Sequence, residues 1–170
     1  MKQTPQMQAV QRALRPGNIT RDGFLGTDPR ELSDLLAADD AVVKALDLTH
    51  RRIAERMTAL RDAGRRGLGD FISVPQHFEV RVDSVRGQLP CPFGHPGLIA
   101  KTNITVRNLA LKAEVTFTDL NIHLIADHGF YEGRGSPFRV DPAGLAHILE
   151  IQNDRRAGDR GVIHTRRRAP

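Results

Sequence analysis

The chain has little of what secreted, membrane-spanning or aromatic-rich proteins depend on. Cys91 is the single cysteine among 170 residues, so no disulfide can form within the chain. There is no tryptophan and aromatic residues make up 5% of the sequence, so the predicted core is mainly leucine, isoleucine and valine. No stretch approaches the roughly 20 apolar residues that cross a bilayer, and residues 1–14 lack the apolar segment of a signal peptide. We therefore expect a cytoplasmic protein with no membrane role.

Length and composition predict one domain with two tails. A chain of 170 residues, with 39% hydrophobic and 26% charged residues, suits a single globular domain. Residues 1–27 are polar and interrupted by proline and glycine, which predicts a flexible N-terminal arm. From residue 153 the sequence is rich in arginine and glycine, which predicts a disordered basic tail over 153–170. The folded domain then covers residues 28–152.

Helices are expected in the first part of this domain. Asp28-Pro29 has the pattern of an N-cap followed by a proline at the first helical position, which predicts a short helix. A longer helix is predicted over 40–63, because apolar residues from Val43 to Leu60 recur at spacings of three and four. This stripe can form a homodimer seam, but in a globular protein we favour packing on the protein's own sheet. His50 interrupts the stripe and is interpreted as a boundary residue.

The middle of the chain predicts a small antiparallel sheet. Apolar and polar residues alternate over 78–83, which is typical of a strand with one buried face. Two shorter alternating runs, at 104–106 and 115–117, are separated by a turn over 108–112. The fold class is therefore α+β, with N-terminal helices packed on a small antiparallel sheet.

Two more helices are predicted after the sheet. Thr118-Asp119 offers an N-cap, and Gly129 supplies a stop directly after His128. Asp141-Pro142 repeats the pattern of cap and proline for a last helix. A histidine therefore stands at the end of the first of these helices.

Four candidate metal ligands occur as two local pairs, Cys91 with His95 and His123 with His128. The first pair lies in a turn rich in proline and glycine, and the second lies on the predicted helix. A tetrahedral zinc site needs four nitrogen or sulfur donors, usually supplied as two such pairs. Residues five apart on an ideal helix differ by about 500° of rotation, so we expect the last turn to loosen before His128. The sequence predicts a zinc ion linking a knuckle, a hairpin and a helix.

The order of knuckle, hairpin and helix resembles the zinc-finger and treble-clef superfamilies over roughly residues 89–129. The resemblance rests on the ligands, and it implies a structural metal site. The first pair is Cys and His where two cysteines are usual, and the segment between the pairs is longer than the customary linker. Residues 118–139 also resemble a stretch of uncharacterised bacterial proteins, which implies no activity.

A catalytic site is the alternative to a structural one. If His95 did not bind, a Cys-His-His zinc would keep a position for water, and Glu132 or Asp127 could act as general base. Both carboxylates can equally orient a ligating imidazole or be solvated. The chain has no HExxH and no His-x-Glu with CxxC, so the motifs of zinc proteases and deaminases are absent from the sequence. We therefore favour a structural zinc and no enzymatic activity.

Basic residues outnumber acidic ones, 25 to 20, which gives a net charge of +5. The residues Arg51, Arg52 and Arg56 on the long helix are candidates for phosphate contacts, as is the tail. Gly133–Ser136, with Arg134 and Arg139, can be read as an anion site, although a simple turn is favoured. The sequence thus predicts a zinc-binding interaction module. Its expected partner is nucleic acid or another protein. The alternative is a small zinc-dependent hydrolase with an open Cys-His-His site.

Overall fold

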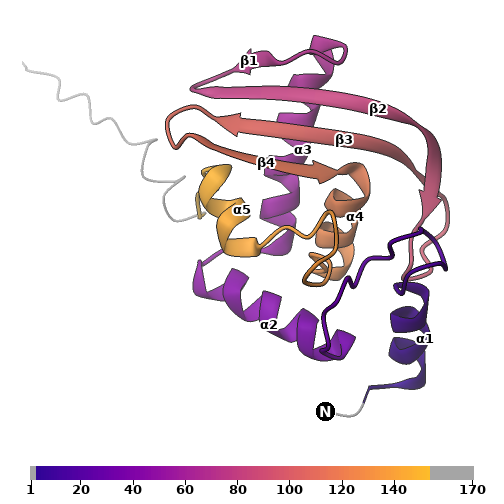
Figure 1. Ribbon diagram of the computed structural model, residues 1–170. Helices are drawn as coiled ribbons and strands as arrows, with labels where there is room; N and C mark the ends of the chain where they lie inside the picture. The colour runs from indigo at the N-terminus through magenta and orange to yellow at the C-terminus, as the bar shows by residue number, and fades with distance from the viewer. Residues whose placement is uncertain (1–2, 154–170) are drawn as a thin grey trace, which may run out of the picture.

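The computed structural model describes residues 3–153 (Figure 1), in which helices lie against one curved sheet. The helical elements are α1 (Pro5–Ala13), α2 (Leu32–Ala45), α3 (His50–Gly64), the short 3-10 helix η1 (Arg65–Gly67), α4 (Asp119–His128) and α5 (Pro142–Ile148). The strands are β1 (Ile72–Val74), β2 (Phe78–Pro90), β3 (Leu98–Asn108) and β4 (Ala113–Thr118). This arrangement confirms the predicted α+β class.

The sheet is antiparallel throughout, with strand order β1-β2-β3-β4. The predicted strands and the predicted turn at 108–112 are confirmed, since β3 ends at Asn108 and β4 begins at Ala113. The β2–β3 pairing shifts register between Ser84 and Gln88, and Gly87 takes a φ of 110° there. Beyond this irregularity the hairpin bends towards the N-terminal segment, as Figure 1 shows.

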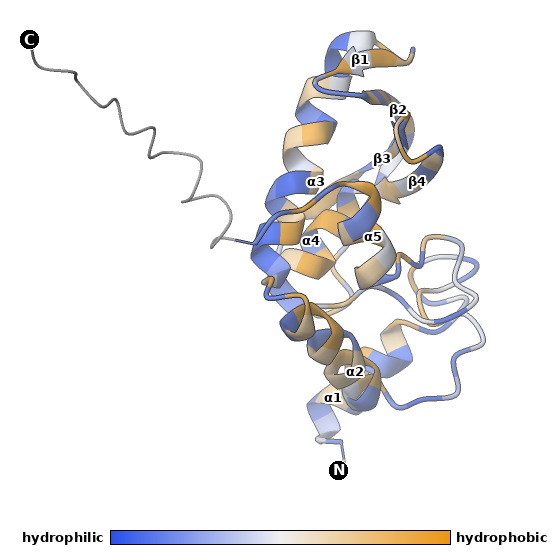
Figure 2. Cartoon of the chain, turned by 90° about the vertical axis from the view of Figure 1, so that its left-hand side faces the viewer, coloured by the Kyte–Doolittle hydropathy of each residue, from blue (hydrophilic) through white to orange (hydrophobic). Residues whose placement is uncertain are grey.

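Two hydrophobic clusters hold the layers together. The first joins α3 and α5 to the sheet and includes Met57, Val80 and Ile104. The second joins the N-terminal segment, α2 and α4, and includes Leu14 and Leu124. Helix α4 belongs to both clusters, since its Ile122 and Ile125 lie in the first. In Figures 1 and 2 the helices α1 and α2 lie at the end of the molecule opposite β1.

Aromatic residues are few but concentrated in the interior. The side chains of Phe117, Phe130 and Tyr131 are completely buried, and these are the largest buried side chains among residues 3–153. Phe130 thus packs in the core. Within the same residues no helix has the length and apolar character needed to cross a bilayer.

Both ends of α4 are fixed by local chemistry that the sequence predicted. Thr118 accepts a hydrogen bond from the backbone N–H of Asn121, whose side chain in turn accepts from the backbone N–H of Thr118, forming a capping box. Gly129 ends the helix with a left-handed φ of 61°. A Cβ atom there would lie 2.9 Å from Nε2 of His50, so glycine is required for space as well as conformation.

The prediction of one long helix over 40–63 is wrong. Helix α2 ends at Ala45 and α3 begins at His50, because Asp47 takes a left-handed φ of 55° and Thr49 caps α3 by accepting from the N–H of Arg52. Val43 and Leu60, at the ends of the predicted stripe, are both buried in the chain's own core. Dimerisation through this region stays a prediction.

The start of the chain also differs from the prediction. Residues 5–13 form α1, and Leu14 is completely buried, so the predicted flexible arm packs in part against the fold. The N-cap position of α2 is Glu31, whose side chain makes no capping hydrogen bond, and the Asp28 carboxylate instead binds the backbone N–H and the side chain of Arg30. The predicted tail lies outside the described residues apart from Asn153.

Candidate metal centre

The end of β2 and the end of α4 bring Cys91 and His128 together. Cys91 follows the last residue of β2 and begins a tight turn, in which its carbonyl oxygen accepts from the N–H of Gly94 at 3.0 Å. Its Sγ lies 3.4 Å from Nε2 of His128. Bond lengths of about 2.3 Å for Zn–S and about 2.0 Å for Zn–N place tetrahedral ligand atoms roughly 3.3–3.6 Å apart. The Cys91–His128 separation therefore already suits a shared zinc ion.

All four predicted ligands converge. One ligand atom from each of Cys91, His95, His123 and His128 lies within 4.8 Å of the others, and among residues 3–153 this is the set that could hold a metal ion. This limit exceeds the tetrahedral separations by about 1.2–1.5 Å, so metal binding requires the ligands to move closer together. His95 and His128 are close already, with ring centroids 4.4 Å apart.

The His123 ring has one nitrogen satisfied and one without a partner. Its Nδ1 lies 2.9 Å from Oδ2 of Asp127, one turn along α4. Its Nε2 is buried and has no hydrogen-bond partner among the described residues. A buried polar atom without a partner is costly unless something binds it. His123 belongs to the converging donor set, so a metal ion bound there would give this nitrogen a partner.

The protonation of the cluster also suits metal binding. Burial, together with repulsion from His95 and His123, lowers the pKa of His128 to about 4. Burial likewise lowers the pKa of His123, against the attraction of Asp127. Neutral imidazole is the form that coordinates metal, so these rings are prepared to bind at neutral pH.

Phe93 fixes the orientation of the knuckle. Its ring stacks on the His128 ring with centroids 4.0 Å apart and planes 8° from parallel, and it meets Phe130 edge-on at 5.7 Å. The contact ties the knuckle to the second hydrophobic cluster. The sequence interpretation did not assign Phe93 a role, although its position two residues after Cys91 was a usable signal.

The expected loosening of α4 before His128 is not observed, because the helix includes that residue. His128 faces Cys91 with Nε2, and Nδ1 of His123 faces Asp127, which leaves Nε2 of His123, the ring nitrogen far from the backbone, for the cluster. The length of the imidazole side chains therefore compensates for the different directions in which the two residues leave the helix.

The two carboxylates proposed as general bases occupy different surroundings. Asp127 stands beside the cluster, with Oδ2 also 3.7 Å from Nδ1 of His95. Glu132 is 2% exposed, and its carboxyl accepts hydrogen bonds from Nδ2 of Asn121 and Oγ of Ser136. It is not among the converging residues. Asp127 is thus placed to orient imidazoles, whereas Glu132 belongs to another part of the fold.

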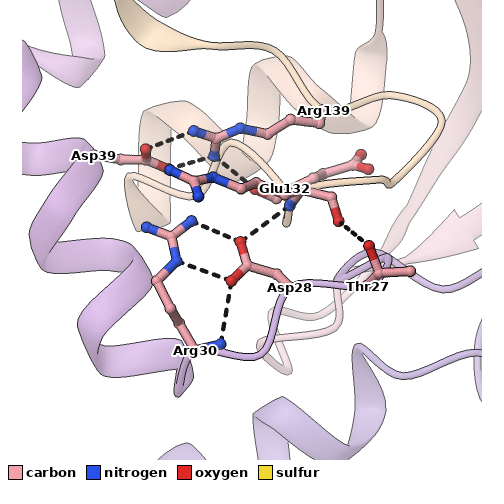
Figure 3. A network of polar contacts seen from close by, with 7 residues as sticks. Thr27, Asp28, Arg30, Asp39, Glu132 and Arg139 are labelled. Carbon is pink, nitrogen blue, oxygen red and sulfur yellow. Dashed lines mark hydrogen bonds and ion pairs between the residues drawn. The ribbon is translucent and has the colours of Figure 1, made fainter.

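Arg139, predicted to bind an anion, is held inside the protein. Its guanidinium binds both carboxylate oxygens of Asp39, at 2.6 and 2.7 Å, and the carbonyl oxygen of Glu132 at 2.6 Å (Figure 3). Arg134 is exposed, and its backbone N–H and carbonyl bind Asp28 and Thr27. The turn is therefore fixed by backbone contacts, in agreement with the simpler interpretation of this segment.

The arginines predicted on the first long helix are spread along α3. Arg51 is exposed, and Arg52 lies 3.8 Å from Glu55. Nε of Arg56 donates to the Leu149 carbonyl at 3.1 Å, and its guanidinium lies 5.1 Å from the centre of the Phe78 ring. Arg56 is therefore committed largely to packing, while Arg51 is the most open of the three.

Comparison with known proteins adds no relationship. No protein-family model matches the chain, and no curated protein or solved structure matches it either. The resemblance to zinc fingers and treble clefs stays a prediction, and the functional argument rests on the cluster itself.

Proposed function

We propose that the chain is a zinc-binding interaction module in which a closed Cys-His-His-His site fastens the knuckle after β2 to the end of α4. The observation that carries this proposal is the convergence of Cys91, His95, His123 and His128, in which His123 has a buried Nε2 without a partner among the described residues. One thiolate and three imidazoles form a donor set that suits zinc.

A structural site is favoured over a hydrolytic one. Four protein donors fill a tetrahedral zinc, whereas catalytic zinc keeps a position for water. The Glu132 carboxyl is bound to Asn121 and Ser136, and Asp127 is bound to His123. Glu132 lies outside the converging set, and Asp127 is engaged with the His123 imidazole, so neither is placed as the general base of an open metal position. The zinc instead supplies a cross-link between two segments far apart in sequence.

Metal content and coordination number test this proposal together. We expect about one zinc per chain, and a cobalt-substituted protein should show the intense visible absorption of four-coordinate Co²⁺ with a thiolate ligand. Cys91→Ser and His123→Ala should each abolish binding at micromolar metal, and His77→Ala serves as the matched control. His77 lies elsewhere, with Nε2 2.8 Å from Glu150. A folded protein that takes up no zinc, or a five- or six-coordinate cobalt spectrum, would refute the closed site.

Nucleic acid is the first partner we propose for the module. The support is the net charge of +5 together with exposed arginines such as Arg51 and Arg134. Arg139 and Arg56 are excluded from this surface because the fold uses their guanidinium groups internally. A protein partner would be indicated if the module shows no affinity for either DNA or RNA.

A further inference from the structure

A second candidate site lies away from the metal cluster, in a cavity of about 300 Å³ beneath the bent β2–β3 hairpin. Residues 20–24, the hairpin, the start of α4 and residues 132–138 all contribute to its walls. The apolar part of the lining includes Phe24, Leu89, Leu120 and Phe138. Its volume is at the lower end of those that hold small ligands, so the occupant must be small and largely apolar.

One buried carboxyl in this lining has unused acceptor capacity. The Glu132 oxygens accept one hydrogen bond each, from Nδ2 of Asn121 at 2.8 Å and from Oγ of Ser136. An ionised carboxylate offers about four acceptor positions and no donor, so roughly two positions remain. A ligand that meets this carboxylate must therefore donate hydrogen bonds.

The same carboxyl lacks a cationic partner. Among residues 3–153, Arg139 is the cation whose charge acts to lower the pKa of Glu132, but its guanidinium is bound to Asp39 and to the Glu132 backbone carbonyl. In Figure 3 the Glu132 carboxyl points away from that guanidinium. Burial consequently raises the pKa of Glu132 to about 7. A cation placed in the cavity would stabilise the ionised form.

The mouth of the cavity is compatible with a positive charge. Asp22 lines it and is exposed, and no ion pair of this carboxylate is found within the described part of the chain. Lys101 also lines it, but its side chain packs across Gly87 at the bend of β2. Two carboxyl groups therefore face the cavity against one ammonium group.

The backbone at Glu132 is held in an uncommon conformation. Its φ of 66° lies in the left-handed region, which is unfavourable for a residue with a side chain. Two contacts maintain it, the bond from Arg139 to its carbonyl and the bond from the Gly133 N–H to the Phe24 carbonyl at 2.8 Å. Such strain is concentrated at functional sites because the surrounding structure must hold it.

From these observations we propose that the cavity binds a small organic amine, with its ammonium group on the Glu132 carboxylate and its apolar body between Phe24, Leu120 and Phe138. This site is independent of the zinc cluster. It adds a small-molecule ligand to a protein whose proposed role is otherwise structural.

Titration of zinc-loaded, full-length protein with benzylamine, benzyl alcohol and benzoate tests the proposal. The three probes share one apolar body and differ in charge. Amide signals of residues 20–24 and 132–138 should shift on addition of benzylamine, which should bind at least about tenfold more tightly than benzyl alcohol, while benzoate should not bind. Equal affinity for the three probes, or no saturable binding of benzylamine, would overturn the proposal.

Two variants distinguish the contribution of the Glu132 carboxyl to amine binding from the contribution of the cavity space. Glu132→Gln should reduce the ratio of the benzylamine affinity to the benzyl alcohol affinity to near unity. Glu114→Gln, at an exposed position of β4, should leave this ratio unchanged. Ala100→Trp, at an exposed position in the lining, should block both probes without disturbing the core. If Glu132→Gln does not fold, the Ala100→Trp result decides, since unchanged benzylamine binding there would place the amine elsewhere.

Discussion

Nδ1 of His123 lies 2.9 Å from Oδ2 of Asp127, one turn further along α4. The carboxylate accepts a hydrogen bond from Nδ1–H of the neutral ring, which leaves the lone pair of Nε2 available to the cluster. Such carboxylate contacts fix the tautomer of a ligating imidazole and raise its basicity. This contact favours a role for Asp127 in positioning the His123 imidazole over the role of a general base.

Replacing Asp127 with asparagine should therefore weaken zinc binding without abolishing it. The amide keeps an acceptor oxygen but loses the charge, so we expect the affinity to fall by about 10- to 100-fold. Competition with a chromophoric chelator measures this change. Asp83→Asn, in the exposed pair with Arg81, is the matched control and should have no effect. Equal affinities for Asp127→Asn and the parent protein would contradict the orienting role.

Removal of the metal should lower the melting temperature reversibly. Zinc at about 1,000 times its dissociation constant stabilises the folded state by about 4 kcal/mol. For a domain of this size each kcal/mol corresponds to about 2–4 °C, so a chelator should lower the melting temperature by roughly 8–16 °C. Calorimetry before and after zinc is restored checks this. Cys91→Ser should melt at the temperature of the chelated protein and gain nothing from added zinc.

The sequence was sufficient for features determined by neighbouring residues. The ends of α4 follow from Thr118 and Gly129, and the ligand pairs could be recognised because each is compact in sequence. The break between α2 and α3 was missed because the apolar spacing continues across it, while Asp47 takes a left-handed conformation that periodicity does not reveal. The cap at Thr49 was the available signal.

Long-range partners could not be derived from the sequence. Arg139 was interpreted as an anion-binding residue, yet its partner Asp39 lies 100 residues away in α2. Glu132 was likewise assigned by its nearness in sequence to His128, whereas Asn121 and Ser136 determine where its carboxyl points. The sequence shows that a side chain is charged, but it does not show whether that side chain faces solvent or a buried partner. For Arg139 this depends on how α2 packs against residues 132–139.

The Asp39–Arg139 pair should be essential to stability. The two side chains are 5% and 16% exposed, so Arg139→Met leaves a carboxylate buried without its partner. Removing one member of a buried pair typically costs about 3–5 kcal/mol, which urea denaturation should detect. The double variant Asp39→Leu/Arg139→Met should lose less than the single one. Arg81→Met, which breaks an exposed pair, should cost at most about 1 kcal/mol.

Nucleic-acid binding through exposed arginines such as Arg51 and Arg134 should depend steeply on salt concentration. Each phosphate contact contributes a slope of about −0.9 to the logarithm of affinity against the logarithm of salt concentration, because counterions are released. Labelled DNA and RNA titrated at about 50 and about 200 mM salt measure the slope. Arg51→Ala/Arg52→Ala should reduce it, and a protein ending at Gln152 reports on the tail. No binding at low salt would remove nucleic acid as the partner.

The pH dependence of stability should carry the signature of Glu132. Its pKa is raised from 4.5 to about 7 in the folded protein, chiefly by burial, so the unfolded chain releases this proton more readily. The stabilisation is fully present below pH 4.5 and is lost as the pH rises through about 7. A change of this size corresponds to about 3 kcal/mol.

Glu132→Gln has no proton to lose at this position, so its free energy of unfolding should rise relative to that of the parent protein between pH 4.5 and 7.5. Urea denaturation of both proteins across this range, with zinc-free samples compared separately, isolates the contribution. The amide can still accept from Asn121, so the comparison changes ionisation more than packing. Parallel stability curves would show that the folded protein ionises Glu132 as easily as the unfolded chain does, and the uncompensated buried carboxyl on which the amine site depends would then not exist.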